Sequence, residues 1–259
     1  MSGTILYMQL VVDNRVVGYD RMGSGKRVVL LLHGWGANRQ TMVPVARMLD
    51  TKKYDIIMPD VPGFGESEMP AAPSWGLLEY AEWVKKLLEK LHVSSVYGLV
   101  GHSNGGAIAI KLVSVGWVQP DKLILLGASG VRNREKGKKL FFKAVAKAGR
   151  AGTVMLPGKV KRGLRSKWYK KIGSELYDNP GLEQTFKKVT SEDLVVEAAM
   201  ISVPTLLVYG AEDRATPPVY GRVYHEVIEG SQLMIVEGAG HYAFIDKPSA
   251  VEQALHSFL

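Results

Sequence analysis

Short apolar runs alternate along the chain with stretches that have a helical pattern. Six runs have strand length and are rich in leucine or β-branched residues, with little alternation of polar and apolar positions: 27–33, 54–59, 96–101, 122–127, 205–210 and 233–238. Such runs are typical of strands buried on both faces of a sheet. Because helix-like stretches separate them, the pattern predicts an α/β fold with a mostly parallel sheet covered by helices.

Residues 77–92 give the clearest helical signal. Apolar side chains recur there at the spacing of one helix face, at Leu77, Leu78, Ala81, Val84, Leu87, Leu88 and Leu91. The first part of the chain has a different pattern, because residues 7–27 alternate polar and apolar positions. We expect this segment to form an antiparallel hairpin that leads into the sheet.

Composition narrows the class of protein. The chain has 259 residues, 46% hydrophobic and 22% charged, which suits one soluble core or a core with an insertion. The longest aliphatic stretch, 28–32, is too short to span a bilayer, and no basic leader precedes an apolar segment, so a cytoplasmic location is expected. With no cysteine, disulfides, thiol chemistry and cysteine metal sites are excluded.

Cofactor signals are weak throughout the chain. The stretch 23–26, GSGK, resembles part of a phosphate-binding loop, but Asp20 stands where the first glycine should be and Arg27 replaces the hydroxyl residue. Histidines and carboxylates lack the paired spacing of a metal site. We therefore expect no metal, no other cofactor and no nucleic-acid partner.

Ser103 lies in a GxSxG pattern between a predicted strand and a predicted helix. Such a match arises by chance about 0.2 times in a chain of this composition, so the flanking residues have to show whether Ser103 is a nucleophile. A sharp strand-to-helix turn brings backbone segments close together, which favours glycine at Gly101 and Gly105. The turn would expose the Ser103 hydroxyl at the carboxyl edge of the sheet, so the sequence predicts a nucleophile there.

A serine nucleophile needs a base and an acid to orient that base. Asp213 follows the strand 205–210 and His241 follows the strand 233–238. Because the carboxyl ends of parallel strands meet at one edge of a sheet, Ser103, Asp213 and His241 can converge. The acid could instead be Glu212.

Donors for a substrate oxyanion are expected from two backbone amides. The glycines of the loop after strand 27–33 let the chain turn so that the amide of Trp35 faces Ser103. The amide of Asn104, which follows the serine at the start of a helix, is the expected second donor.

Five stretches together carry a resemblance: HGWG, DVPGFGES, GHSNGG, GAEDRATPP and GAGHYAF. They resemble the serine esterase and lipase branch of the α/β-hydrolase fold superfamily, from about residue 28 to the end, with about 130 to 200 outside the pattern. The resemblance implies an eight-stranded sheet flanked by helices, with a hydrolase core at 1–129 and 203–259. It also implies that residues 130–202 form an inserted helical cap, or lid.

The resemblance further implies the roles of individual residues. Ser103 would be the nucleophile, His241 the base and Asp213 its orienter, and the amides of Trp35 and Asn104 would form the oxyanion hole. The expected activity is that of a carboxylic ester hydrolase with an acyl-serine intermediate, acting on small to medium acyl esters. Asn104 departs from the methionine, leucine or glutamine that is frequent in relatives, but the implied role uses only its backbone.

Two other functions fit the same residues, a carbon–carbon bond hydrolase and a low-turnover ligand receptor that keeps the triad. The aspartate-nucleophile branch is disfavoured, because position 103 is serine. For His33 and His102 we expect hydrogen bonding near the turn rather than a role as base. We expect Asp60 to stabilise a turn.

Positive charge is concentrated in the segment that lies outside the pattern. Residues 130–190 hold 17 of the 33 Lys and Arg but only 4 of the 25 Asp and Glu. Within this segment, 138–150 has the pattern of an amphipathic helix with apolar side chains on one face. One interpretation is that this segment is a purely structural cap. The other is that its charge attracts a partner, which would be an anionic substrate, an acidic carrier or a membrane surface. The oligomeric state is left open.

Overall fold

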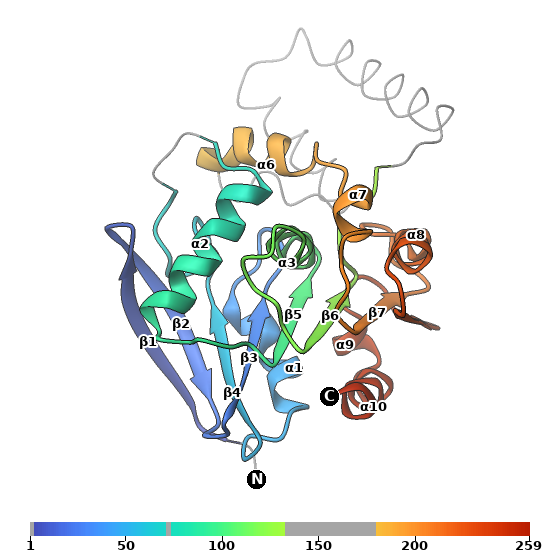
Figure 1. Cartoon of the computed structure of the whole chain (residues 1–259), viewed down its shortest axis with the longest axis horizontal. Coiled ribbons are helices and arrows are strands. Elements are labelled where there is room, and N and C mark those ends of the chain that lie inside the picture. The colour runs from blue at the N-terminus through green and yellow to red at the C-terminus, as the bar shows by residue number, and fades with distance from the viewer. Residues whose placement is uncertain (1–2, 71–73, 133–179) are drawn as a thin grey trace, which may run out of the picture.

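The computed structural model describes residues 3–70, 74–132 and 180–259. Within them one sheet has the strand order β1-β2-β4-β3-β5-β6-β7-β8 (Figure 1). The strands are β1 (Ile5–Val12), β2 (Arg15–Met22), β3 (Arg27–Leu32), β4 (Tyr54–Pro59), β5 (Gly98–His102), β6 (Lys122–Leu126), β7 (Thr205–Gly210) and β8 (Gln232–Val236). All six predicted buried strands are present: β4 and β7 have the predicted bounds, and the ends of the other four are shifted by at most two residues.

The sheet is mixed but mostly parallel. β1 and β2 form the predicted antiparallel hairpin, closed by Asp13 and Asn14, which both have positive φ. β2 is also antiparallel to β4, whereas every pairing from β4 through β3 to β8 is parallel. Six strands therefore end at the same edge of the sheet.

Helices cover both faces of the sheet (Figure 1). One face carries α2 (Leu77–Lys90), α3 (Asn104–Ser114) and α8 (Pro218–Val227), and the other carries α1 (Val43–Arg47), α9 (Ala243–Asp246) and α10 (Pro248–Phe258). Along β3, Leu30 and Leu32 pack on the first face and Val29 and Leu31 on the second. This double burial explains why the strands lack polar alternation.

The predicted helix at 77–92 is α2, which ends two residues earlier, at Lys90. Leu91 caps it and His92 has a φ of 55°, which stops the helix. Among the described residues, no helix has the length and apolar character needed to cross a membrane.

Part of the expected cap lies within the described residues. It comprises the 3-10 helix η2 (Pro180–Leu182), α6 (Glu183–Val189) and α7 (Val195–Ala198), and α6 lies near the N-terminal end of α2 (Figure 1). The hydroxyl of Thr185 accepts the Trp75 amide at 3.0 Å, and Glu192 accepts the Leu77 amide at 2.8 Å. The amphipathic helix expected at 138–150 lies outside the described residues. The remaining 3-10 helix, η1 (Arg39–Met42), follows β3.

Candidate active site

Ser103 occupies the sharp turn between β5 and α3. Its φ of 52° and ψ of −115° are rare for a residue with a side chain. The turn is held in place from both sides: the Ser103 amide donates to the carbonyl of Leu126 at 3.0 Å, and its carbonyl accepts the Ser129 amide at 3.1 Å. The surrounding sheet therefore stabilises the strained conformation that the GxSxG pattern predicts.

Glycine is required beside Ser103 because backbone segments approach closely. A Cβ atom on Gly105 would lie 2.3 Å from the carbonyl oxygen of Leu32, and one on Gly101 would lie 2.5 Å from that of Gly105. Both distances are far below van der Waals contact. The glycines thus let α3 start directly against β3 and β5.

Asp213 and His241 meet at the carboxyl edge of the sheet, after β7 and β8. His241 Nδ1 lies 2.8 Å from Asp213 Oδ2. The other carboxylate oxygen of Asp213 accepts the amides of Ala215 at 2.8 Å and Thr216 at 2.9 Å. Glu212 forms no such bond with His241, so the alternative acid is not the histidine's partner in this structure.

The carboxylate of Asp213 is buried and ionised. Burial by itself raises the pKa of Asp213, but the hydrogen bond and charge of His241 outweigh it, with further hydrogen bonds from Thr216, and the pKa lies below its ordinary value. An ionised partner fixes the Nδ1 proton of His241 and leaves Nε2 as the basic nitrogen.

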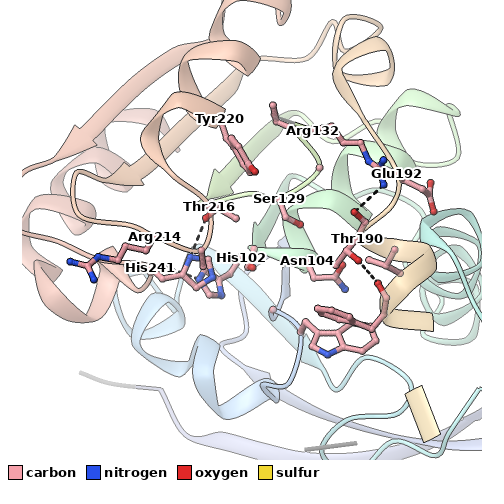
Figure 2. Close-up of a pocket in the computed structure, with 18 of the residues that line it drawn as sticks. His102, Asn104, Ser129, Arg132, Thr190, Glu192, Arg214, Thr216, Tyr220 and His241 are labelled. Atoms are coloured by element: carbon pink, nitrogen blue, oxygen red, sulfur yellow. Dashed lines mark hydrogen bonds between the residues drawn. The ribbon is translucent and has the colours of Figure 1, made fainter. Parts of the chain in front are cut away.

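Sequence reasoning missed Thr216. Its hydroxyl lies 2.8 Å from Asp213 Oδ2. It also lies 3.1 Å from His241 Nδ1, the contact that Figure 2 marks with a dashed line. A signal was present, because a threonine three residues after an aspartate can close a turn onto that carboxylate. The spacing alone does not reveal that His241 lies beside the same hydroxyl.

The loop after β3 approaches Ser103 closely. A Cβ atom on Gly34 would lie 3.1 Å from the Cβ of Ser103. The next residue, Trp35, lines the same cavity as Asn104, and neither backbone amide donates a hydrogen bond to another described residue. Two free N–H groups beside a serine are the donors that an oxyanion needs.

His33 holds this loop in place. Its Nδ1 donates to the carbonyl of Gly34 at 2.8 Å, and its Nε2 accepts the amide of Val61 at 2.9 Å. Burial lowers the pKa of His33, which keeps the ring neutral and able to accept. His33 therefore has the hydrogen-bonding role expected from the sequence.

Asp60 stabilises a turn, as expected, and also belongs to a buried ion-pair network. Its carboxylate accepts the amides of Glu66 at 2.8 Å and Arg39 at 2.6 Å, and it pairs with the Arg39 guanidinium. The same guanidinium pairs with Asp20 at 2.9 Å. The sequence did not reveal this network, which joins the loop after β4 to β2.

A cavity of about 630 Å³ opens at this edge of the sheet. Its apolar lining includes Trp35, Phe186 and Val189, and the Trp35 and Phe186 ring centroids are 5.1 Å apart. Its polar lining includes Ser129 and Tyr220 (Figure 2). Burial, with the charge of Asp213, raises the pKa of Tyr220, so this phenol stays protonated at neutral pH.

Ser103, His241, Thr216, Trp35 and Asn104 all line this one cavity. No hydrogen bond joins the Ser103 hydroxyl to His241 within the described residues, although both face the same space. The side-chain oxygen of Asn104 is buried and has no hydrogen-bond partner among the residues that the structure describes. In the same ranges no three His, Cys, Asp or Glu side chains are placed to hold a metal ion. The arrangement suits acyl transfer through a serine.

The fold and this site define the class of α/β hydrolases. The family model described as alpha/beta hydrolase fold matches residues 27–248, and the chain belongs to that family. It is 28% identical to the AB hydrolase superfamily protein YisY of Bacillus subtilis, over 92% of this chain and 93% of that protein. It is 24% identical to Lipase 1 of Psychrobacter immobilis, over 84% of this chain and 72% of the lipase.

A solved structure gives the same assignment. An esterase from Exiguobacterium antarcticum superimposes with a TM-score of 0.74 at 26% identity, covering 99% of this chain and 98% of the esterase. The protein is therefore a hydrolase of the α/β fold whose relatives include proteins named lipase and esterase.

Proposed function

We propose that this protein is a carboxylic ester hydrolase that works through Ser103, His241 and Asp213. The observation that carries the proposal is the 2.8 Å hydrogen bond between His241 Nδ1 and Asp213 Oδ2 at the cavity that Ser103 also lines. A histidine oriented in this way offers Nε2 as a base to a serine hydroxyl. The relatives named lipase and esterase support an ester as the substrate.

In the first half of the reaction, Ser103 Oγ attacks the ester carbonyl carbon while its proton passes to His241 Nε2. The carbonyl oxygen becomes an oxyanion that accepts hydrogen bonds from the amides of Trp35 and Asn104. His241 then gives the proton to the alcohol oxygen as the carbon–oxygen bond breaks. The acyl group remains on Ser103 and the alcohol leaves.

In the second half, water attacks the carbonyl carbon of the acyl-serine and gives a proton to His241 Nε2. The bond to Ser103 Oγ breaks, His241 returns the proton to that oxygen, and the carboxylic acid leaves. One ester and one water are thus converted to one acid and one alcohol, and no cofactor is consumed.

The cavity favours small to medium acyl groups. Its volume of about 630 Å³ lies within the usual range for sites that bind small molecules. Trp35 supplies both a proposed oxyanion donor and, with Phe186, an aromatic wall. An acyl chain whose carbonyl faces the donors can therefore pack directly against these rings.

The test is multiple-turnover hydrolysis of a series of p-nitrophenyl esters of increasing acyl length. We expect turnover for short to medium chains, and labelling by a fluorophosphonate on Ser103 alone. Ser103→Ala should lose the label and lower kcat by about 10⁶-fold. Near-normal turnover by this variant, or an adduct on another serine, would refute the mechanism.

The two alternative functions predict different results, and a ring-opened dienoic acid is assayed beside the esters to detect the first of them. Cleavage of a ring-opened dienoic acid without ester turnover would point to a carbon–carbon bond hydrolase. Tight ester binding followed by a single slow turnover would point to a receptor.

A further inference from the structure

Thr216 has its hydroxyl between the three groups that surround the Nδ1 side of His241. Its Oγ1 lies 3.1 Å from His241 Nδ1, 2.8 Å from Asp213 Oδ2 and 2.8 Å from the backbone carbonyl oxygen of Gly127. The residue is only 4% exposed. A hydroxyl carries one proton, so at any moment Thr216 donates either to the Asp213 carboxylate or to the Gly127 carbonyl. Its lone pairs are directed at His241 Nδ1.

The carboxylate of Asp213 accepts three hydrogen bonds at all times, and a fourth when the Thr216 hydroxyl donates to it rather than to the carbonyl of Gly127. The Thr216 amide donates to Oδ1, beside the amide of Ala215, and the Thr216 hydroxyl reaches Oδ2, beside His241. A carboxylate has about four acceptor sites, so the four donors together saturate it. A saturated carboxylate cannot rotate without losing a buried hydrogen bond, and this fixes the direction in which it presents Oδ2 to His241.

We propose that Thr216 is a positioning residue for His241, and that its hydroxyl keeps the Nδ1 proton of the ring directed at Asp213. This inference rests on the proposed function, because the position of the ring matters only if Nε2 serves as the base. When His241 takes the proton of Ser103, the imidazolium draws the carboxylate toward it. The hydroxyl of Thr216 holds that carboxylate from the side.

Substitution can separate the hydroxyl from the rest of the residue. Thr216→Val keeps the shape and the backbone amide and removes only the hydroxyl, whereas Thr216→Ser keeps the hydroxyl. A matched control is Thr205→Val. Thr205 is fully buried at the start of β7, its hydroxyl donates to the carbonyl of Val203 at 2.8 Å, and it does not line the cavity.

We expect Thr216→Val to lower kcat on a p-nitrophenyl ester by about tenfold with little change in KM. The hydroxyl is one of the groups that lower the pKa of Asp213, so its loss should leave a more basic carboxylate. The hydrogen-bonded pair of Asp213 and His241 should then keep its proton to higher pH, and the acid limb of kcat/KM should move in that direction. Thr216→Ser should restore both quantities and Thr205→Val should change neither. An unshifted acid limb, or equal effects at positions 216 and 205, would overturn the proposal.

A second measurement needs no turnover. In proton NMR, the Nδ1 proton of a histidine held by a carboxylate gives a slowly exchanging low-field signal, and we expect it in the wild type and in Thr216→Ser. In Thr216→Val it should exchange faster and broaden, and an unchanged signal would overturn the proposal. If it broadens although the wild type hydrolyses no ester, the ester hydrolase is refuted and the positioning of His241 is supported.

Discussion

The Nε2 atom of His102 lies 3.1 Å from the backbone carbonyl oxygen of His241, so the residue before Ser103 holds the loop that carries the proposed base. The two rings are also in contact, with centroids 4.7 Å apart. Donation from Nε2 requires the proton on that nitrogen, and Nδ1 of His102 is then buried without a partner in the described residues. Burial, followed by the charge of His241, lowers the pKa of His102 to about 3.

This lowered pKa predicts a loss of stability in acid. The unfolded chain takes up a proton at His102 near pH 6.5 and the folded protein does not until about pH 3, so stability falls as the pH drops through that window. His102→Gln keeps a donor for the His241 carbonyl but cannot titrate. We expect the free energy of unfolding in urea to fall between pH 7 and pH 5 by about 2 kcal/mol less in the variant than in the wild type.

The comparison isolates His102, because His33, whose pKa is also lowered by burial, is present in both proteins. An NMR titration of the wild-type His102 ring gives the same answer without a variant. Equal acid sensitivity of the two proteins, together with a ring that titrates near pH 6.5, would show that burial does not keep His102 neutral.

Asp213→Asn should lower kcat by about 10⁴-fold, because an amide in place of the carboxylate favours the wrong tautomer of His241. The matched control is Glu212→Gln, at the neighbouring acid, which lines the cavity but forms no hydrogen bond with His241. We expect that control to retain kcat within a few-fold. Steady-state kinetics of both variants on one ester show which acid orients His241. A large loss of kcat in Glu212→Gln alone would assign that role to Glu212.

Asn104→Leu tests whether only the backbone of this residue contributes to the reaction. The side-chain oxygen of Asn104 is buried and finds no hydrogen-bond partner in the described part of the chain, and such a group costs about 1–3 kcal/mol of stability. Leucine has a similar shape and no polar atom, so thermal unfolding should shift to higher temperature by a few degrees. Ester turnover should stay within a few-fold of the wild type, and a loss comparable to that of Asp213→Asn would assign a role to the side chain.

The sequence predicted the sheet and the positions of the candidate site residues, and it did so for a physical reason. Strands buried on both faces must be continuously apolar, and a serine on a tight turn must have small neighbours, as Gly105 against Leu32 illustrates. Because parallel strands deliver their ends to one edge, Asp213 and His241 could be expected to meet although 28 residues separate them.

Features that depend on convergence of distant segments were not predictable in the same way. The hydroxyl of Thr216 acquires its relation to His241 only when β6, β7 and β8 are side by side, and β2 pairs with β4 rather than with its successor β3. The pairing of Arg39 with both Asp20 and Asp60 likewise joins the 3-10 helix η1, strand β2 and the loop after β4. Such contacts leave no local pattern in the sequence from which they could be predicted.

The charge of residues 130–190 leads to a further prediction about substrates. This segment has a net charge of +13, and part of it, including Arg132, lines the cavity. A concentration of positive charge near a cavity attracts anions, and salt weakens the attraction. We expect kcat/KM for an anionic ester to exceed that for a neutral ester of the same acyl length at low salt.

At about 0.5 M salt, where the screening length falls below ~5 Å, this preference should diminish. Changing Lys139, Lys143 and Lys147 together to glutamine should reduce it at low salt, and cosedimentation with anionic vesicles tests whether a membrane surface is attracted instead. The neutral ester is the internal control, because its kcat/KM reports on the chemistry without the charge. If both esters respond equally to salt and neither the triple variant nor the vesicles have an effect, the positive charge of residues 130–190 attracts neither the substrate nor a membrane surface.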